Sequence, residues 1–294
     1  MKNVVVGVAV SVSMTLSSMV IAESFSDDFE GGFGSSSFFR WGGEAYTDIS
    51  SDKAYGGSDS LRFRFLGNPD LTEDAWAEKR FTLDKIYDEL WIRYKLWVPE
   101  NYVHRDGDGP DNNKGLIMLW SGEYTGHSAS TSLHFGRPLP GQNADGGSMI
   151  YGAWRPNSGI TGNFYNDSNF VDDYFTPEEV NVGIHPSDRG SWIDWVIHVK
   201  ASSIPIDVGD ISGDGNGKVQ VWKNGQLTYN AISANNFYED KSRNGWDQGY
   251  ILGWANSGFN EDTFIHIDDF MISTTPEGVD FDLDKPRMGA VFKE

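Results

Sequence analysis

Alternation of apolar and polar residues is the main structural signal along this chain. Between Glu89 and Val98, one set of alternate positions holds Leu90, Ile92, Tyr94, Leu96 and Val98, and the other holds Glu89, Trp91, Arg93, Lys95 and Trp97. Successive side chains of a strand point to opposite faces, so this stretch is predicted to be a strand with a core face and an indole-and-cation face. Leu116–Trp120 is continuously apolar, which predicts a buried strand. We expect the two strands to form a hairpin around the acidic loop 101–114.

The same reasoning predicts strands along most of the chain. They are expected at 60–66, 75–82, 128–136, 149–154, 192–200, 218–222, 249–255 and 263–273, and Asn224–Gly225 is predicted to be a tight turn. The helical signal is confined to a short stretch at 177–180, and 155–189 is predicted to be a long loop of the kind that often carries function. These elements predict an all-β fold, a single jelly-roll β-sandwich of two antiparallel sheets with one sheet concave.

The two ends of the chain differ from the predicted domain. Residues 1–22 combine a short basic start, an apolar stretch and a small-residue cleavage site after Ala22, which predicts a signal peptide; the alternative is a membrane anchor. The protein is therefore expected to be secreted or periplasmic and to leave the membrane after cleavage. The β-sandwich is expected over 23–273, followed by a polar tail over 274–294. The sequence has no cysteine, so its stability must come from its core or from metals. We expect a monomer.

Charge and aromatic content limit the partners. The formal net charge of −20 argues against nucleic acid, whose recognition requires a basic surface. The 11 Trp, 12 Tyr and 18 Phe are consistent with an aromatic-rich β-sandwich. Indoles interleaved with cations on one strand face suit a surface that stacks on sugar rings and pairs with acidic groups. The sequence thus favours a polysaccharide partner, expected to be acidic.

Four segments together resemble a known fold family. They are DDFEGG (27–32), GGSDSLRF (56–63), GKVQVWKNG (217–225) and FIHIDDFMIS (264–273). In this order they resemble the concanavalin A-like jelly roll of secreted carbohydrate-active proteins, and within it the polysaccharide lyases of the alginate-lyase type. Those lyases carry a charged strand, a Gln-x-His strand and a late Tyr-rich strand on one concave sheet. Here Glu78–Arg80, Ser132–His134 and Tyr250–Asn256 match them, although Ser132 replaces the glutamine and the late strand lacks the family's full motif.

The resemblance implies cleavage of a uronic-acid polysaccharide by β-elimination. A lyase must neutralise the sugar carboxylate, remove the proton from the adjacent carbon and protonate the leaving oxygen. His134 is the leading candidate base because histidine titrates near neutrality, and Tyr151 is a candidate acid or base. Arg93 and Lys114 are candidates for neutralising the carboxylate. The alternatives are a structural role for His134, core packing for Tyr151 and a solvated strand face for Arg93.

Further residues are candidates for holding the sugar chain. They come from the indole-and-cation strand, from the return of the acidic loop, from the turn after His134 and from the later strands: Trp91, Lys95, Trp97, Asn113, Arg137, Trp154, Tyr250 and Trp254. The alternative for Lys95 is again a solvated strand face. We expect the concave sheet to be lined by Trp91, Arg93, Lys95, Trp97, His134 and Tyr151.

Calcium is the one cofactor that the sequence suggests, and no organic cofactor is expected. Asp210–Asn216 resembles the first half of a Ca²⁺ loop, with Asp210 and Asp214 as ligands, but Val221 occupies the place of the expected glutamate. A plain Gly/Asp-rich turn is the alternative. In sandwiches of the resembling family, an opening acidic residue and a closing aspartate share a structural Ca²⁺, and Glu30 and Asp268 occupy those places. Asp106, Asp108 and Asp111 are a weaker third set.

The leading functional hypothesis is a polysaccharide lyase, and three alternatives remain open. The first is a non-catalytic, lectin-like carbohydrate-binding protein, which uses the same aromatic face. The second is a glycoside hydrolase of the same fold. A retaining hydrolase needs two carboxylates about 5–5.5 Å apart, and the Glu-x-Asp-x-x-Glu pattern of the related hydrolases is absent from the sequence. The third is an adhesion or structural module without a soluble glycan ligand.

Overall fold

A computed structural model describes the chain at residues 22–68, 75–102, 112–119, 130–136, 149–155, 184, 186–204, 215–234, 245–255 and 258–283. Its strands are β1 (Ser24–Asp27), β2 (Phe39–Ala45), β3 (Thr47–Ser50), β4 (Ser60–Phe65), β5 (Ala75–Tyr87), β6 (Glu89–Val98), β7 (Asn112–Leu119), β8 (Ser130–Gly136), β9 (Met149–Arg155), β10 (Ser191–Lys200), β11 (Gly217–Lys223), β12 (Gln226–Ala234), β13 (Trp246–Ala255) and β14 (Thr263–Ser273). Two short 3-10 helices, η3 (Pro186–Asp188) and η5 (Glu277–Val279), accompany them. Within the described residues, no helix is long and apolar enough to cross a membrane.

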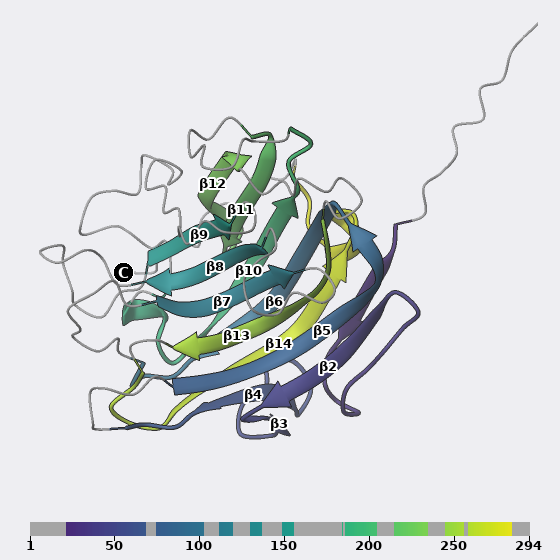
Figure 1. Cartoon of the computed structure of the whole chain (residues 1–294). Coiled ribbons are helices and arrows are strands. Elements are labelled where there is room, and N and C mark those ends of the chain that lie inside the picture. Colours follow the sequence, from purple (N-terminus) through teal and green to yellow (C-terminus); the bar gives the residue numbers. More distant parts are fainter. Residues whose placement is uncertain are drawn as a thin grey trace, which may run out of the picture.

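The strands form two antiparallel sheets that lie face to face (Figure 1). The eight-stranded sheet has the order β12-β11-β10-β6-β14-β4-β3, and β1 pairs with β14. The six-stranded sheet has the order β2-β5-β13-β7-β8-β9. The strands of the described residues pair antiparallel, so the predicted jelly-roll β-sandwich is confirmed.

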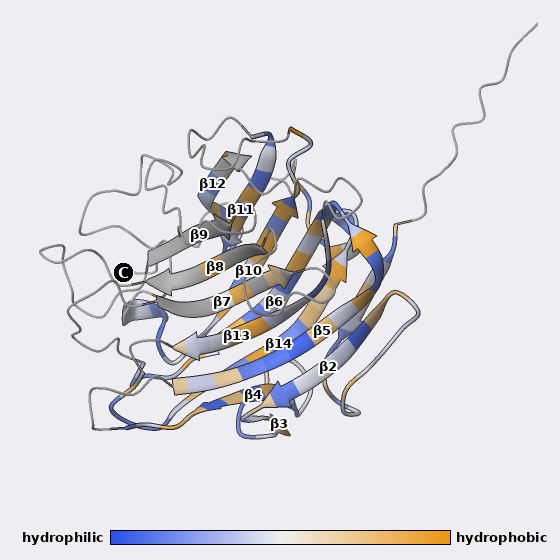
Figure 2. Ribbon diagram, in the orientation of Figure 1, coloured by the Kyte–Doolittle hydropathy of each residue, from blue (hydrophilic) through white to orange (hydrophobic). Residues whose placement is uncertain are grey.

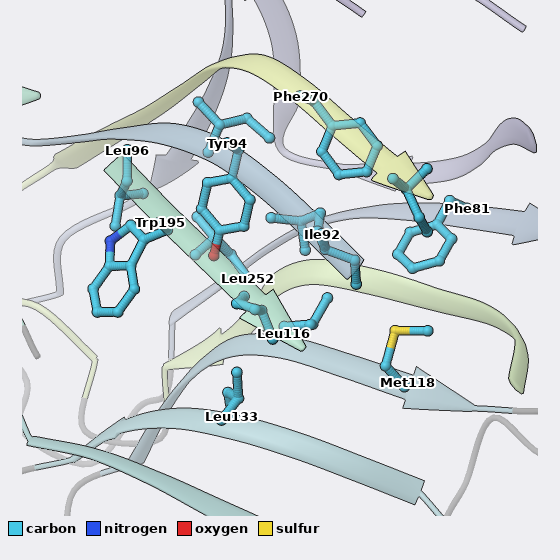
Figure 3. Close-up of a cluster of buried hydrophobic side chains, with 14 of the residues drawn as sticks. Phe81, Ile92, Tyr94, Leu96, Leu116, Met118, Leu133, Trp195, Leu252 and Phe270 are labelled. Carbon is cyan, nitrogen blue, oxygen red and sulfur yellow. The ribbon is translucent and has the colours of Figure 1, made fainter. Parts of the chain in front are cut away.

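The core lies between the two sheets, where apolar side chains from both inner faces meet (Figure 3). Leu90, Ile92, Tyr94, Leu96 and Val98 are all buried in it, which confirms the predicted core face of β6. Phe81 of β5, Leu116 of β7 and Leu133 of β8 approach them from the six-stranded sheet. Along the ribbons, apolar and polar residues alternate, as expected for strands with one covered face (Figure 2).

The predicted hairpin over 89–122 is wrong. β6 pairs with β10 and β14 in the eight-stranded sheet, whereas β7 pairs with β13 and β8 in the six-stranded sheet. The chain therefore crosses from one sheet to the other after β6. Each strand buries one face in the same core, so their apolar patterns alone could not distinguish a hairpin from a crossover.

The segment after β14 packs on the outer face of the eight-stranded sheet. Val279 and Phe281 are buried in a small second cluster with Trp91 and Trp222. The described part of the predicted polar tail, 274–283, therefore belongs to the packed structure. The predicted signal peptide lies outside the described residues apart from Ala22.

Candidate functional site

Three of the predicted catalytic residues are cross-strand neighbours on three adjacent strands. In the register of the six-stranded sheet, His134 of β8 pairs with Lys114 of β7 on one side and with Tyr151 of β9 on the other. Leu133 is buried in the core, so alternation places His134 on the outer face of this sheet. Directly opposed residues of antiparallel strands share a face. The backbone thus brings Lys114, His134 and Tyr151 together on the outer face.

A bulge in β7 makes this alignment possible. Leu116 pairs with Leu133 and is buried in the core, while Lys114, two residues earlier, pairs with His134. Without an extra residue, Lys114 and Leu116 would share a face. The register shift between them moves Lys114 to the opposite face from Leu116, which is the re-aiming effect that bulges have in sheets.

The outer face continues across β13 and β5. Tyr250 pairs with Arg80, and the next residue of β13, Ile251, is buried in the core. Further along the same strands, Trp254 pairs with Trp76, and their rings are stacked with centroids 5.2 Å apart and an interplanar angle of 5°. Trp254 keeps 41% of its surface exposed. An exposed indole on a sheet face offers a flat apolar platform with a polar N–H at its edge.

Glu78 holds two members of this face in position. Its carboxylate accepts a hydrogen bond from Trp76 Nε1 at 2.9 Å and from Arg80 Nε at 2.6 Å, and Glu78 itself is 1% exposed. A buried carboxylate with charge-assisted partners is a strong anchor. The Glu78–Arg80 strand that the resemblance indicated therefore lies in the same sheet as His134. Trp76 was missed, although its spacing of two from Glu78 was visible in the sequence.

Two predicted sugar-binding residues occupy other register positions. Asn113 pairs with Ala255, and alternation puts it on the opposite face from Lys114. Trp154 pairs with Thr131 and, three residues after Tyr151, lies on the opposite face from it. The register therefore does not bring these two residues to the outer face that carries His134. Arg137 lies outside the described residues.

The prediction that the indole-and-cation face of β6 lines the same sheet as His134 and Tyr151 is wrong. Trp91, Arg93, Lys95 and Trp97 lie on the outer face of the eight-stranded sheet, with the whole core between them and β8. The error follows from the hairpin that was assumed for 89–122.

The C-terminal segment around Asp280 and Phe281 covers the first half of that β6 face. Trp91 is 4% exposed, stacks on His198 at 4.0 Å and packs near Phe281. Arg93 is 8% exposed and forms two hydrogen bonds of 2.9 Å with the Asp194 carboxylate. The same guanidinium donates to the backbone carbonyl of Asp280 at 2.6 Å. Trp91 and Arg93 therefore hold the C-terminal segment onto the sheet.

Glu30 and Asp268 both bind the loop between β3 and β4. Glu30 Oε1 accepts the backbone N–H of Ser58 at 2.7 Å and of Asp59 at 2.8 Å, and hydrogen bonds to these groups lower the pKa of Glu30. Asp268 Oδ2 accepts the N–H of Tyr55 at 2.7 Å.

Among the described residues there is no cluster of three or more His, Asp or Glu side chains suited to a metal. The calcium hypothesis for Glu30 and Asp268 stays a prediction, and Asp210 and Asp214 lie outside the described residues.

The architecture, two antiparallel sheets packed face to face, is that of the concanavalin A-like jelly roll. No family model and no curated protein matches the sequence. Among solved structures, the chain is similar to an endo-β-1,4-glucuronan lyase from the fungus Trichoderma reesei, with 14% identity, a TM-score of 0.54 and coverage of 87% of this chain and 97% of that one.

An alginate lyase, vAL-1, from Chlorella virus follows with 12% identity, a TM-score of 0.48 and coverage of 81% and 93%. A Bacteroides ovatus mixed-linkage-glucan GH16 protein has 11% identity, a TM-score of 0.47 and coverage of 84% and 98%. At such identities, the likeness to the glucuronan lyase shows the fold alone.

Proposed function

We propose that this protein is a polysaccharide lyase that cleaves a chain containing uronic acids by β-elimination on the outer face of its six-stranded sheet. The observation that carries the proposal is the register that aligns Lys114, His134 and Tyr151 across β7, β8 and β9. The stacked pair of Trp254 and Trp76 on the same face supports it, since a sugar chain needs a platform as well as reacting groups.

The roles follow from the chemistry of each side chain. Lys114 neutralises the uronate carboxylate, which stabilises the negative charge that develops when the neighbouring carbon loses its proton. His134 takes that proton, because a neutral imidazole is a base matched to neutral pH. Tyr151 gives a proton to the leaving glycosidic oxygen. One C–H and one C–O bond break, and a C=C bond forms in the uronate ring on the reducing-end side of the cut, which becomes the new non-reducing end of that fragment.

Arg80 supplies a second cation on this face. It pairs with Tyr250 in the register and is held by Glu78 at 2.6 Å, with 40% of its side chain exposed. A fixed guanidinium suits planar carboxylates, so Arg80 is proposed to bind the carboxylate of a neighbouring sugar rather than that of the reacting one.

The test is to incubate the purified protein with glucuronan, alginate and other uronans and to follow the ultraviolet absorbance of unsaturated chain ends. The absorbance should rise with at least one substrate. Replacing His134 with Ala should lower turnover by about 100-fold or more, which is the range of general base catalysis. Lys85→Ala, a change of an exposed lysine near the far end of β5, serves as the control for Lys114→Ala. No absorbance on any uronan contradicts the lyase.

A carbohydrate-binding protein without catalysis is the second candidate, and the exposed Trp254 platform favours it because such a platform can hold a sugar chain without any reacting group. This candidate predicts binding to a uronan without products, binding that Trp254→Ala weakens and His134→Ala leaves intact. The appearance of saturated reducing ends would instead indicate a glycoside hydrolase.

A further inference from the structure

Three aromatic side chains form a cluster on the outer face of the eight-stranded sheet, opposite the proposed active site. Trp97 comes from β6, Trp192 from β10 and Tyr55 from the loop between β3 and β4. The ring centroids of Trp97 and Trp192 are 5.8 Å apart, and those of Tyr55 and Trp192 are 5.9 Å apart. Tyr55 is 52% exposed, and both indoles are half-buried. We call these three residues the aromatic cluster.

The sheet and the loop between β3 and β4 both fix the arrangement of the aromatic cluster. Trp97 and Trp192 are direct cross-strand partners in the β6–β10 register, so their spacing is fixed by the sheet. The backbone N–H of Tyr55 donates to the buried carboxylate of Asp268 at 2.7 Å, and Glu30 fixes the next turn of the loop through Ser58. The three rings therefore keep their arrangement without a ligand, which reduces the entropic cost of binding one.

Two lysines border the rings. Lys53 Nζ lies 4.8 Å from the centroid of Trp97, and Lys95 Nζ lies 4.7 Å from that of Tyr55. Lys53 is exposed, whereas Lys95 also pairs with Asp194 at 3.2 Å. On a chain with a formal net charge of −20, the exposed Lys53 ammonium beside these rings is a local exception, whereas the Lys95 side chain is 13% exposed. Isolated exposed aromatics are common, but three contiguous rings with two cations are characteristic of a binding surface.

We propose that the aromatic cluster, with Lys53 and Lys95, is a second glycan-binding surface that holds a chain of acidic sugars. The rings would stack on the apolar faces of successive sugars, and the ammonium groups would pair with their carboxylates. This surface lies on the opposite sheet from the proposed active site, and its existence does not depend on the lyase activity.

The described histidine next to this surface is enclosed. His266 pairs with Trp97 in the register, but it is 3% exposed and its Nδ1 is 2.9 Å from Ser60 Oγ. Burial, aided by Arg62, lowers the pKa of His266 to about 4, so it is neutral and enclosed at pH 7. His266 is therefore not available as a base for a chain bound here.

The test is affinity electrophoresis in native gels that contain alginate, glucuronan or a neutral β-glucan. The starting protein carries His134→Ala and Trp254→Ala, so that the polymer is not cut and binding to the six-stranded sheet is weakened. Adding Tyr55→Ala and Trp192→Ala should weaken the remaining binding of uronans about tenfold or more, the usual loss when interface anchors are removed. Lys53→Ala should weaken uronan binding in a salt-dependent way.

Phe264→Ala is the matched control, because Phe264 is a 38% exposed ring on the outer face of β14. It should leave the retardation unchanged. Thermal unfolding of each variant shows that the fold is kept. Retardation that is insensitive to Tyr55→Ala with Trp192→Ala overturns the proposal, and so does equally strong binding of the neutral glucan. A protein without lyase activity whose uronan binding requires Tyr55 and Trp192 supports this surface and contradicts only the proposed function.

Discussion

Removing the Arg93 guanidinium is expected to destabilise the protein strongly. Arg93 Nε and Nη2 each donate to the Asp194 carboxylate at 2.9 Å. Nη1 donates to the carbonyl oxygens of Val279 at 3.1 Å and Asp280 at 2.6 Å. In Arg93→Ala, one buried carboxylate and two carbonyls of the C-terminal segment lose their donors together.

The magnitude follows from burial. Arg93 has 10% of its side chain exposed and Asp194 14%, so the pair is far from a surface ion pair. Burial raises the pKa of Asp194, but the bonds from Arg93 and the charge of Lys95 outweigh it, so the net pKa is lowered and the carboxylate is charged at pH 7. Removing one partner of a buried pair costs roughly 3–5 kcal/mol. Because Lys95 stays 3.2 Å from Asp194, we expect the lower end, about 3 kcal/mol.

The measurement is urea unfolding followed by tryptophan fluorescence, in a double-mutant cycle of Arg93→Ala and Asp194→Asn. The Arg93→Lys variant should fall between wild type and alanine, because lysine keeps the charge but cannot donate to the carboxylate and the carbonyls at once. Arg64→Ala is the control on the same sheet, where the guanidinium is 43% exposed and 3.7 Å from Asp48. A loss for Arg93→Ala no larger than about 1 kcal/mol, the value of an exposed pair, would refute this reasoning.

Three further outcomes are expected. Hydrogen bonding from His198 lowers the pKa of Glu89 from 4.5 to about 2. The contribution of ionised Glu89 to the free energy of unfolding is therefore complete above pH 4.5 and is lost as the pH falls toward 2. Glu89→Gln should reduce the pH dependence of the urea unfolding midpoint in this range. Gly57→Ala should cost roughly 1–3 kcal/mol, because Gly57 has a φ of +60° and its added Cβ would overlap the Glu30 carboxylate. Gly56→Ala should be nearly neutral in the same unfolding assay, because its Cβ would meet only Asp269 Oδ1, at an ordinary contact distance of 3.8 Å. If Glu30 helps to hold Ca²⁺, then CaCl₂ raises the melting temperature of the wild type but not of Glu30→Gln; identical values with CaCl₂ and with a chelator contradict a calcium site.

Period-two alternation predicted strand positions well because it is a local property. The alternation over 89–98 matches β6 residue for residue, and the predicted strand 263–273 matches β14. The strands that were missed, β1, β2, β3 and β12, are short, glycine-containing or weakly alternating. Alternation could not predict which strands pair with one another, because it defines the two faces of a strand and contains no information about the neighbouring strands. That is why the sheet change between β6 and β7 was not predicted.

In the candidate site, too, the sequence predicted which strands take part but not how they pair. The resemblance of Ser132–His134 and Glu78–Arg80 to lyase strands placed both in one sheet, and the structure has them there. The role of Lys114 on that face depends on the bulge that separates it from Leu116. Gly115 lies at this bulge and is a residue type that often marks one, but a glycine alone does not define the register. Tertiary register, rather than local propensity, determines which residues meet His134.

The outer face of β6 explains why residue type alone misled the interpretation of this strand. Trp91 and Arg93 at its start, and Lys95 and Trp97 toward its end, are the same two residue types in the same alternation. The first pair is covered by the segment around Phe281 and stabilises the fold. In the second pair, Trp97 is half-buried, and Lys95, with 13% of its side chain exposed, lies over the ring of Tyr55. The two halves of this strand face differ in whether the C-terminal segment covers them. An indole beside a cation stabilises the fold where that segment covers it, and it can contact a ligand where it is left uncovered.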